Sequence, residues 1–269
     1  MRAVWKAVLP VIAVSVSALP AIAGQLQHKT VLEVAFGSIP VGTATFNIRF
    51  DQKSYSLDAS GKTVGVAELF ASGRGKAESS GRFEGGHVIA DKNFVEYVEK
   101  KKTSTLEMAF ANGAVETVKL NPDKRKPKEA PKFVPISPDQ LMSVIDPTSS
   151  IVIPVPYEDA NNPKAVCNRV INIYDGDTRF DIALKYKSTK PVSTQGYDGY
   201  AYVCQLRYVP VAGHRARQRN IEYMSKNKDM EIWLAPMAAT NVFSPIRIEV
   251  PTWLGRVVAQ PSFFGTITN

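Results

Sequence analysis

Apolar and polar residues alternate with a period of two through much of this chain. The segments Lys29–Phe36 and Thr43–Phe50 both show the alternation, and the second places Phe46, Ile48 and Phe50 on one face. Successive side chains of a β-strand point to opposite faces, so period-two segments bounded by Gly and Pro predict strands joined in hairpins. The stretch from Lys29 to Phe50 is therefore predicted to form a β-hairpin with one side buried.

The same alternation predicts strands in both halves of the chain. Those of the N-terminal half are Tyr55–Thr63, Lys76–Phe83, Val88–Val98, Thr103–Phe110 and Val115–Leu120. Those of the C-terminal half are Val170–Tyr174, Thr178–Lys187, Tyr200–Val209, Met230–Leu234, Pro245–Val250 and Arg256–Ala259. Asn112-Gly113, Asp175-Gly176 and Asp198-Gly199 are predicted turns, because Asn-Gly and Asp-Gly favour tight hairpin turns. The segment Val64–Ala71 fits a strand or a short amphipathic helix equally well.

One helix is predicted, after a Pro-rich, basic connection that starts at Asn121. Ser137 is a good N-cap, Pro138 suits the first helical position, and Gln140 stands at the capping-box position. Asp146-Pro147 should end this helix after about three turns. Because strands dominate, the predicted fold is mainly β: a curved antiparallel sheet, or a half-open barrel or spiral, with one central short helix.

The N-terminus has the three parts of a secretory signal peptide. Arg2 and Lys6 are positive, Ala7–Ala18 is mostly apolar, and Ala21-Ile22-Ala23 has small residues where a signal peptidase cleaves. The apolar run is shorter than the roughly 20 residues that span a bilayer. We therefore expect residues 1–23 to be removed after Ala23, and the mature protein to be exported without a transmembrane segment.

The remaining residues, 24–269, are predicted to form a single β-rich domain. Its halves cover residues 24–120 and 148–269, with the linker and the helix at 121–147 between them. The net charge of the chain is +8, and it stays positive once the signal peptide is lost. Such a charge favours anionic partners, and export makes nucleic acid an unsuitable one, so lipid headgroups and cell-wall components remain.

The chain has two cysteines, Cys167 and Cys204. In an exported protein two cysteines most simply form a disulfide with each other. Closing this loop should stabilise the fold by about 4 kcal/mol. The alternative is a pair of buried free thiols.

No residue pattern in the chain indicates catalysis. The three histidines are far apart, which argues against a zinc site and predicts surface positions for them. Asp175, Asp177 and Asp181 lack the glycine and the glutamate of a calcium-binding EF-hand loop, so a hairpin turn is the better interpretation. No metal, cofactor or catalytic residue is predicted, and a non-enzymatic protein is expected, with an enzyme of unknown type as an alternative.

A basic segment supplies the candidate binding residues His214, Arg215, Arg217 and Arg219. If this segment is extended, its three guanidinium groups share one side and suit phosphate or carboxylate groups. The alternative is a solvated connection that pairs with local acids such as Glu222.

Several motifs of the C-terminal half resemble one family. They are Tyr174-Asp175-Gly176-Asp177-Thr178-Arg179-Phe180-Asp181, the series Cys204, Arg207-Tyr208, Pro210 and Gly213-His214-Arg215, then Ile232-Trp233-Leu234 and Pro245-Ile246-Arg247-Ile248. With Gly42, Tyr55 and Ser80-Gly81 of the N-terminal half, they resemble the family named domain of unknown function 3108. The resemblance implies an exported, β-rich envelope protein of Gram-negative bacteria, and it supplies no catalytic residues.

The leading functional hypothesis is a non-enzymatic periplasmic protein that binds an acyl-bearing lipid, a lipoprotein or another envelope component in its curved sheet. Half-barrel lipoprotein carriers are the analogy, at the level of the fold alone. The alternative is a structural or interaction protein that holds peptidoglycan or a protein partner through its basic surface.

Overall fold

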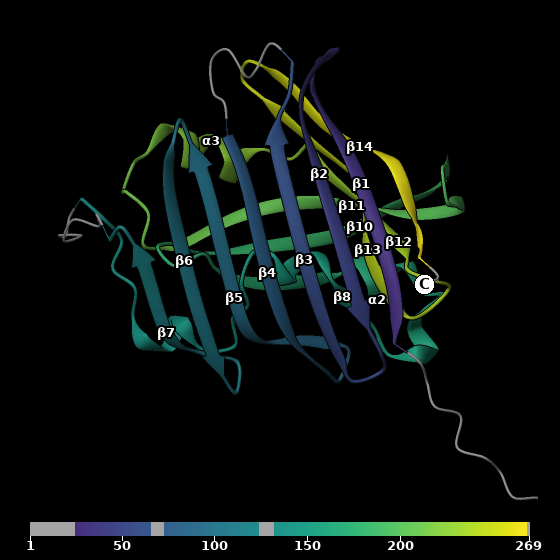
Figure 1. Ribbon diagram of the computed structural model, residues 1–269, viewed down its shortest axis with the longest axis horizontal. Helices are drawn as coiled ribbons and strands as arrows, with labels where there is room; N and C mark the ends of the chain where they lie inside the picture. The colour runs from purple at the N-terminus through teal and green to yellow at the C-terminus, as the bar shows by residue number, and fades with distance from the viewer. Residues whose placement is uncertain (1–24, 66–72, 124–131, 268–269) are drawn as a thin grey trace, which may run out of the picture.

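Fourteen strands form one antiparallel sheet in the computed structural model, which describes residues 25–65, 73–123 and 132–267 (Figure 1). The strands are β1 Leu26–Phe36, β2 Ile39–Phe50, β3 Ser54–Thr63, β4 Gly73–Glu84, β5 His87–Glu99, β6 Lys102–Ala111, β7 Ala114–Asn121, β8 Ile153–Pro154, β9 Arg169–Tyr174, β10 Arg179–Thr194, β11 Tyr197–Ala212, β12 Met230–Pro236, β13 Val242–Thr252 and β14 Gly255–Thr266. The predicted signal peptide and the segment Val64–Ala71 fall wholly or largely outside the described residues, as does the basic run 124–128.

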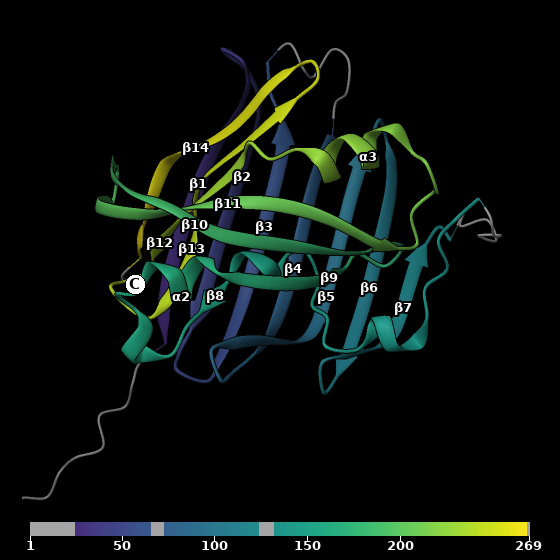
Figure 2. The same cartoon turned by 180° about the vertical axis from the view of Figure 1, so that it is seen from behind.

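The sheet does not close into a barrel. Its order is β7-β6-β5-β4-β3-β2-β1-β14-β13-β12-β11-β10-β9, and β8 adds to β13. Strands β1 to β7 form one broad layer, and the long strands β10 and β11 cross behind it at a steep angle (Figures 1 and 2). The sheet therefore bends over on itself, as the expected curved, half-open architecture requires.

Three clusters of apolar side chains fill the space between the two layers. The inward face of β2 and β3 contributes Ile48, Phe50 and Leu57, each almost fully buried. These side chains meet residues of the second half, among them Ile246 and Phe264. The alternation that predicted the first strands thus places their apolar faces on the core, because the sheet has one buried side.

The segment that connects the two halves passes between the layers and is anchored there by Asp146. This side chain is fully buried, and its Oδ1 accepts hydrogen bonds from Ser79 Oγ at 2.8 Å and from Asn93 Nδ2 at 3.0 Å. Ser149 donates to the same carboxylate through its backbone N–H and its Oγ, and Tyr55 Oη donates to Ser149 Oγ at 2.7 Å. Burial raises the pKa of the Asp146 carboxyl, and the bonds from Ser149 and Ser79 oppose that rise.

The helix predicted to begin at Ser137 is much shorter than expected. It is a single 3-10 turn, Pro138–Leu141, and the Ser137 N–H does bond to Gln140 Oε1 at 3.0 Å. The chain after it is extended at Met142 because the following residues enter the core and bond to β9, where Ile145 N–H donates to Asn172 O. The prediction of three helical turns was wrong, although its start was placed correctly.

Two other local predictions also need correction. The turn before β11 falls at Gln195-Gly196, where Gly196 has φ +85°, and Asp198-Gly199 lies inside the strand. The longest described helix is α3, Arg219–Lys226, in a stretch for which no helix was predicted. Among the described residues no helix has both the length and the apolar character that crossing a bilayer demands.

The predicted disulfide joins Cys167 to Cys204, and both residues are completely buried. Cys204 lies in β11 as expected, whereas Cys167 ends the short helix α2, Pro163–Cys167, rather than standing in a strand. The disulfide therefore fastens the connection before β9 onto the centre of the second layer.

His28 is buried against Phe264, contrary to the surface position expected for every histidine. Its ring centroid lies 4.2 Å from that of Phe264, and Nε2 shares a 3.2 Å hydrogen bond with Thr30 Oγ1. Burial lowers the pKa of this imidazole from 6.5 to about 4. The folded protein thus holds His28 neutral in a pH range in which the unfolded chain would protonate it.

This difference predicts a loss of stability in mild acid. The His28 side chain takes up a proton near pH 6.5 in the unfolded chain and only near pH 4 in the folded protein. The contribution of neutral His28 to the free energy of unfolding is therefore complete above pH 6.5 and falls by about 3 kcal/mol toward pH 4. Urea unfolding of wild type and His28→Leu at pH 7 and pH 4.5 measures it. The variant should lose much of the pH dependence, and His87→Leu, on the surface, should retain it. If the free energy of unfolding changed equally with pH in wild type and in His28→Leu, the buried, neutral His28 would not be the cause of the pH dependence.

Candidate functional site

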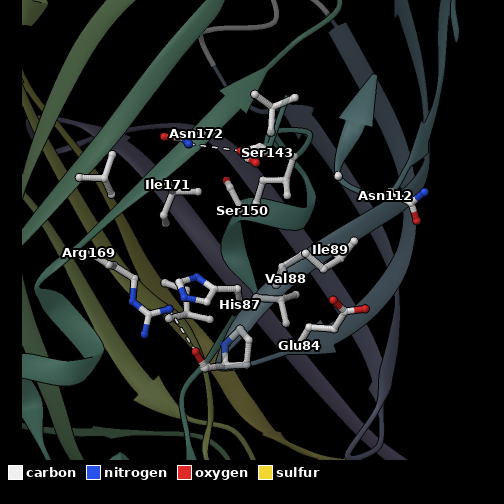
Figure 3. Close-up of a pocket in the computed structure, with 17 residues that line it drawn as sticks. Glu84, His87, Val88, Ile89, Asn112, Ser143, Ser150, Arg169, Ile171 and Asn172 are labelled. Atoms are coloured by element: carbon white, nitrogen blue, oxygen red, sulfur yellow. Dashed lines mark hydrogen bonds between the residues drawn. The ribbon is translucent and has the colours of Figure 1, made fainter. Parts of the chain in front are cut away.

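A cavity of about 420 Å³ opens at the side of the molecule where β9 ends the sheet. We call it the edge cavity. It lies between the start of β5, the β6–β7 turn, the strand β9 and the connecting segment 143–154 (Figure 3). Its wall is mostly apolar, with Val88, Ile89, Val144, Ile145, Val152, Ile153, Val170 and Ile171. This size is within the range of ligand pockets, about 300–1,000 Å³.

Arg169 is the cation of the edge cavity. It stands at the start of β9, and its guanidinium donates to Pro154 O at 3.1 Å and to Ala165 O at 3.0 Å. Its Nε is buried and has no hydrogen-bond partner. Burial lowers the pKa of the group, and within the described part of the chain no carboxylate pairs with it. A partly buried guanidinium without a counter-ion favours an anion beside it.

The other polar groups of the edge cavity either bond to protein groups or are exposed to solvent. Glu84, the acid of the lining, is paired with Arg82 at 2.7 Å and so does not compensate Arg169. The Asn172 amide donates to Ser143 O, as Figure 3 shows. His87 is exposed and lines the cavity at the start of β5 (Figure 3). The positive charge of the cavity therefore comes from Arg169.

The edge cavity combines an apolar wall with one cation. Among residues 25–65, 73–123 and 132–267 no group of His, Cys, Asp and Glu could hold a metal ion. Ser149 bonds to Asp146, but both are buried without a histidine in their network, so the serine lacks a base and access to a substrate. An apolar wall with one unpaired cation can instead hold an apolar molecule by its anionic end.

The predicted arginine segment lies apart from the edge cavity. Arg215 forms an isolated bridge with Phe133, Arg217 is in a turn with φ +56°, and Arg219 begins α3. The segment is therefore not extended. Its three arginine side chains are exposed, and their role in binding an anion or a partner stays a prediction.

Arg169 was not among the residues that the sequence indicated, although a signal for it exists. It shares one face of β9 with Ile171 and Ile173, and a charged residue on an apolar strand face is unusual. The rest of the edge cavity could not have been found in this way. Residues from β5 and from the connecting segment reach it only because the sheet bends over on itself.

An open, barrel-like antiparallel sheet with a ligand-sized cavity at its edge is the class of protein that this fold and site define. The chain belongs to the family described as "Protein of unknown function (DUF3108)", which matches residues 31–260 and confirms the resemblance seen in the sequence. No curated protein matches the chain.

One solved structure supports the same fold. It is the "Beta-barrel-like Protein of Domain of Unknown Function DUF1849 from Brucella abortus", with a TM-score of 0.52 over 90% of this chain and 98% of that one. The two sequences are 8% identical, so the likeness concerns the fold alone. Neither description states a reaction.

Proposed function

We propose that this protein is a non-enzymatic, exported binding protein that takes an acyl chain with an anionic head group into the edge cavity. The observation that carries the proposal is the unpaired, partly buried Arg169 beside a mostly apolar wall. An acyl chain would cover the apolar side chains, and its carboxylate or phosphate would accept a hydrogen bond from Arg169 and neutralise its charge.

The export part of the proposal rests on the N-terminal sequence and on the disulfide. Residues 1–23 have the composition of a signal peptide, and disulfides persist in oxidising compartments such as the periplasm. Such a protein would meet acyl-bearing molecules of the cell envelope, a lipid or the acyl group of a lipoprotein.

Binding of a fatty acid provides the test. Isothermal titration with dodecanoate should show a single site, and Arg169→Met should weaken it about tenfold or more, because it removes a charge-assisted hydrogen bond and keeps a long apolar stem. Arg74→Met, an exposed arginine remote from the edge cavity, should leave the affinity unchanged.

A second variant guards against a folding defect in Arg169→Met. Ser150 lines the edge cavity, so Ser150→Phe should fill the space and abolish binding while Arg169 stays in place. Equal affinity in wild type and both variants would refute the site, and a wild type that binds no dodecanoate or longer fatty acid and carries no extractable lipid after purification would refute the function.

A further inference from the structure

One end of the sheet displays large apolar side chains to solvent. Trp253 is 73% exposed and Leu254 is 66% exposed, in the two-residue turn between β13 and β14. Ile39, which opens β2, is 48% exposed. A tryptophan and a leucine exposed at adjacent turn positions mark a candidate interaction site.

The two turns that carry these residues are joined and held in shape. Gly37 N–H, in the β1–β2 turn, donates to Arg256 O at 2.9 Å. Thr252 Oγ1 donates to Gly255 O at 2.7 Å across the β13–β14 turn. Gly255 has φ +151°, and a Cβ there would come within 2.8 Å of the Phe36 ring, so the ring packs directly on the turn backbone. The two turns are therefore joined, and we call their exposed residues Trp253, Leu254 and Ile39 the apolar tip.

Exposed cations lie at the same end of the sheet as the apolar tip. The Asn227 side chain donates to Pro251 O at 2.7 Å, two residues before Trp253. Lys226 and Lys228, on either side of Asn227, are therefore held near the turn. At the same end of the sheet, Lys62 of β3 lies opposite Arg74 of β4 in the strand register. All four cations are exposed, and in the described ranges none of them makes an ion pair.

The acids of this end do not cancel that charge. Glu249 bonds to Arg247 at 2.7 Å and to Arg256 at 2.6 Å. Asp229 and Glu222 remain beside Lys226 and Lys228, and Glu96 and Glu99 of β5 lie beside Lys62 and Arg74. Three further lysines, at positions 100–102, follow Glu99 at the β5–β6 turn, so the cations of this end still outnumber its acids. This end of the sheet therefore combines an apolar tip with an excess of positively charged side chains.

We propose that this end of the molecule docks on a lipid bilayer that contains anionic lipid. Tryptophan is favoured at the level of the lipid headgroups, and Leu254 and Ile39 can enter the acyl boundary below it. Lysine and arginine side chains near the surface are attracted to anionic headgroups. A protein partner would also cover an apolar tip, but unpaired cations around it complement an anionic surface in particular.

The docking surface is independent of the edge cavity. The turns β1–β2 and β13–β14 and the helix α3 lie at one end of the strands, at the top in Figures 1 and 2, whereas the β4–β5 and β6–β7 turns that border the cavity lie at the other end. Fatty-acid binding and bilayer docking can therefore fail or succeed separately.

Flotation with vesicles tests the docking surface. The mature protein should float with phosphatidylcholine vesicles containing 30% phosphatidylglycerol and at least tenfold less with pure phosphatidylcholine, and added salt should release it. Trp253→Ser/Leu254→Ser should reduce flotation at least tenfold and abolish a blue shift of tryptophan fluorescence on vesicle addition. Tyr157→Ser, which removes a side chain 81% exposed elsewhere, should float like wild type.

Two results would overturn the proposal. One is a wild type that stays with the soluble fraction at low salt, which would leave a protein as the partner of the tip. The other is flotation that the double variant does not reduce, which would place membrane contact elsewhere. Because both changed residues are exposed, an unchanged melting temperature is expected and shows that the double variant is folded.

Discussion

Replacing Asp146 by alanine should lower the free energy of unfolding by about 4 kcal/mol. The carboxylate accepts hydrogen bonds from Ser79, Asn93 and Ser149, and removing it leaves these donors buried without an acceptor, at about 1–3 kcal/mol for a buried group. The loss should also free the connecting segment, since Asp146 is its polar anchor to the first layer. Urea unfolding followed by circular dichroism measures the change.

A matched substitution separates the network from the mere loss of a carboxylate. Asp198 is exposed on β11, and Asp198→Ala should change the free energy of unfolding by less than about 0.5 kcal/mol. If Asp146→Ala were as mild as this control, the hydrogen-bond network would not anchor the segment.

Replacing both cysteines by alanine should lower the melting temperature by about 10 °C. The disulfide closes a loop with a sequence separation of 37 residues, and freeing such a loop costs about 4 kcal/mol in the chain-entropy description. For a protein of this size that free energy corresponds to roughly 8–16 °C. Thermal unfolding under non-reducing conditions is the measurement.

The wild type with and without reductant serves as the internal comparison. Reduced wild type should melt near the Cys167→Ala/Cys204→Ala protein, and reductant should not affect the double variant. If the double variant had the same melting temperature as oxidised wild type, packing of α2 on β11, rather than the disulfide, would hold this region.

Most strands of this protein could be predicted from its sequence, and their shared physical basis is one buried face. Ile48 and Phe50 of β2, for example, stand two residues apart and both are buried. The pairing of Cys167 with Cys204 was predictable because only two cysteines were available. Strand ends and turns were predicted less accurately. The turn predicted at Asp198-Gly199 lies at Gln195-Gly196, because β10 and β11 each run for 16 residues.

The helix after Ser137 shows why local signals can fail. Its cap is good, but the following residues gain more by entering the core than by continuing a helix: Val144 and Asp146 are fully buried, and Ile145 bonds to β9. Tertiary burial outweighs helix propensity, which amounts to less than about 1 kcal/mol per residue. His28 is similar, since only the approach of β14 to β1 brings Phe264 onto it.

The edge cavity was beyond the reach of sequence patterns for a related reason. His87, Ser150 and Arg169 are far apart along the chain and come together through the bend of the whole sheet. A pattern can place Arg169 on one face of a strand, but it cannot show that Glu84, the acid of the cavity lining, is paired with Arg82 instead.

The position of β1 beside β14 has a consequence for how the protein folds. Strands β2 to β7 pair only with their neighbours in sequence, so the meander from β1 to β7 can form from short-range contacts. The seam between β1 and β14 instead joins residues such as Gln27 and Ile267, whose backbones are hydrogen-bonded at 2.8 Å. Closing so long a loop is slow relative to hairpin formation. Folding should therefore finish in the middle of the sheet, where β14, the last strand in the sequence, pairs with β1, the first.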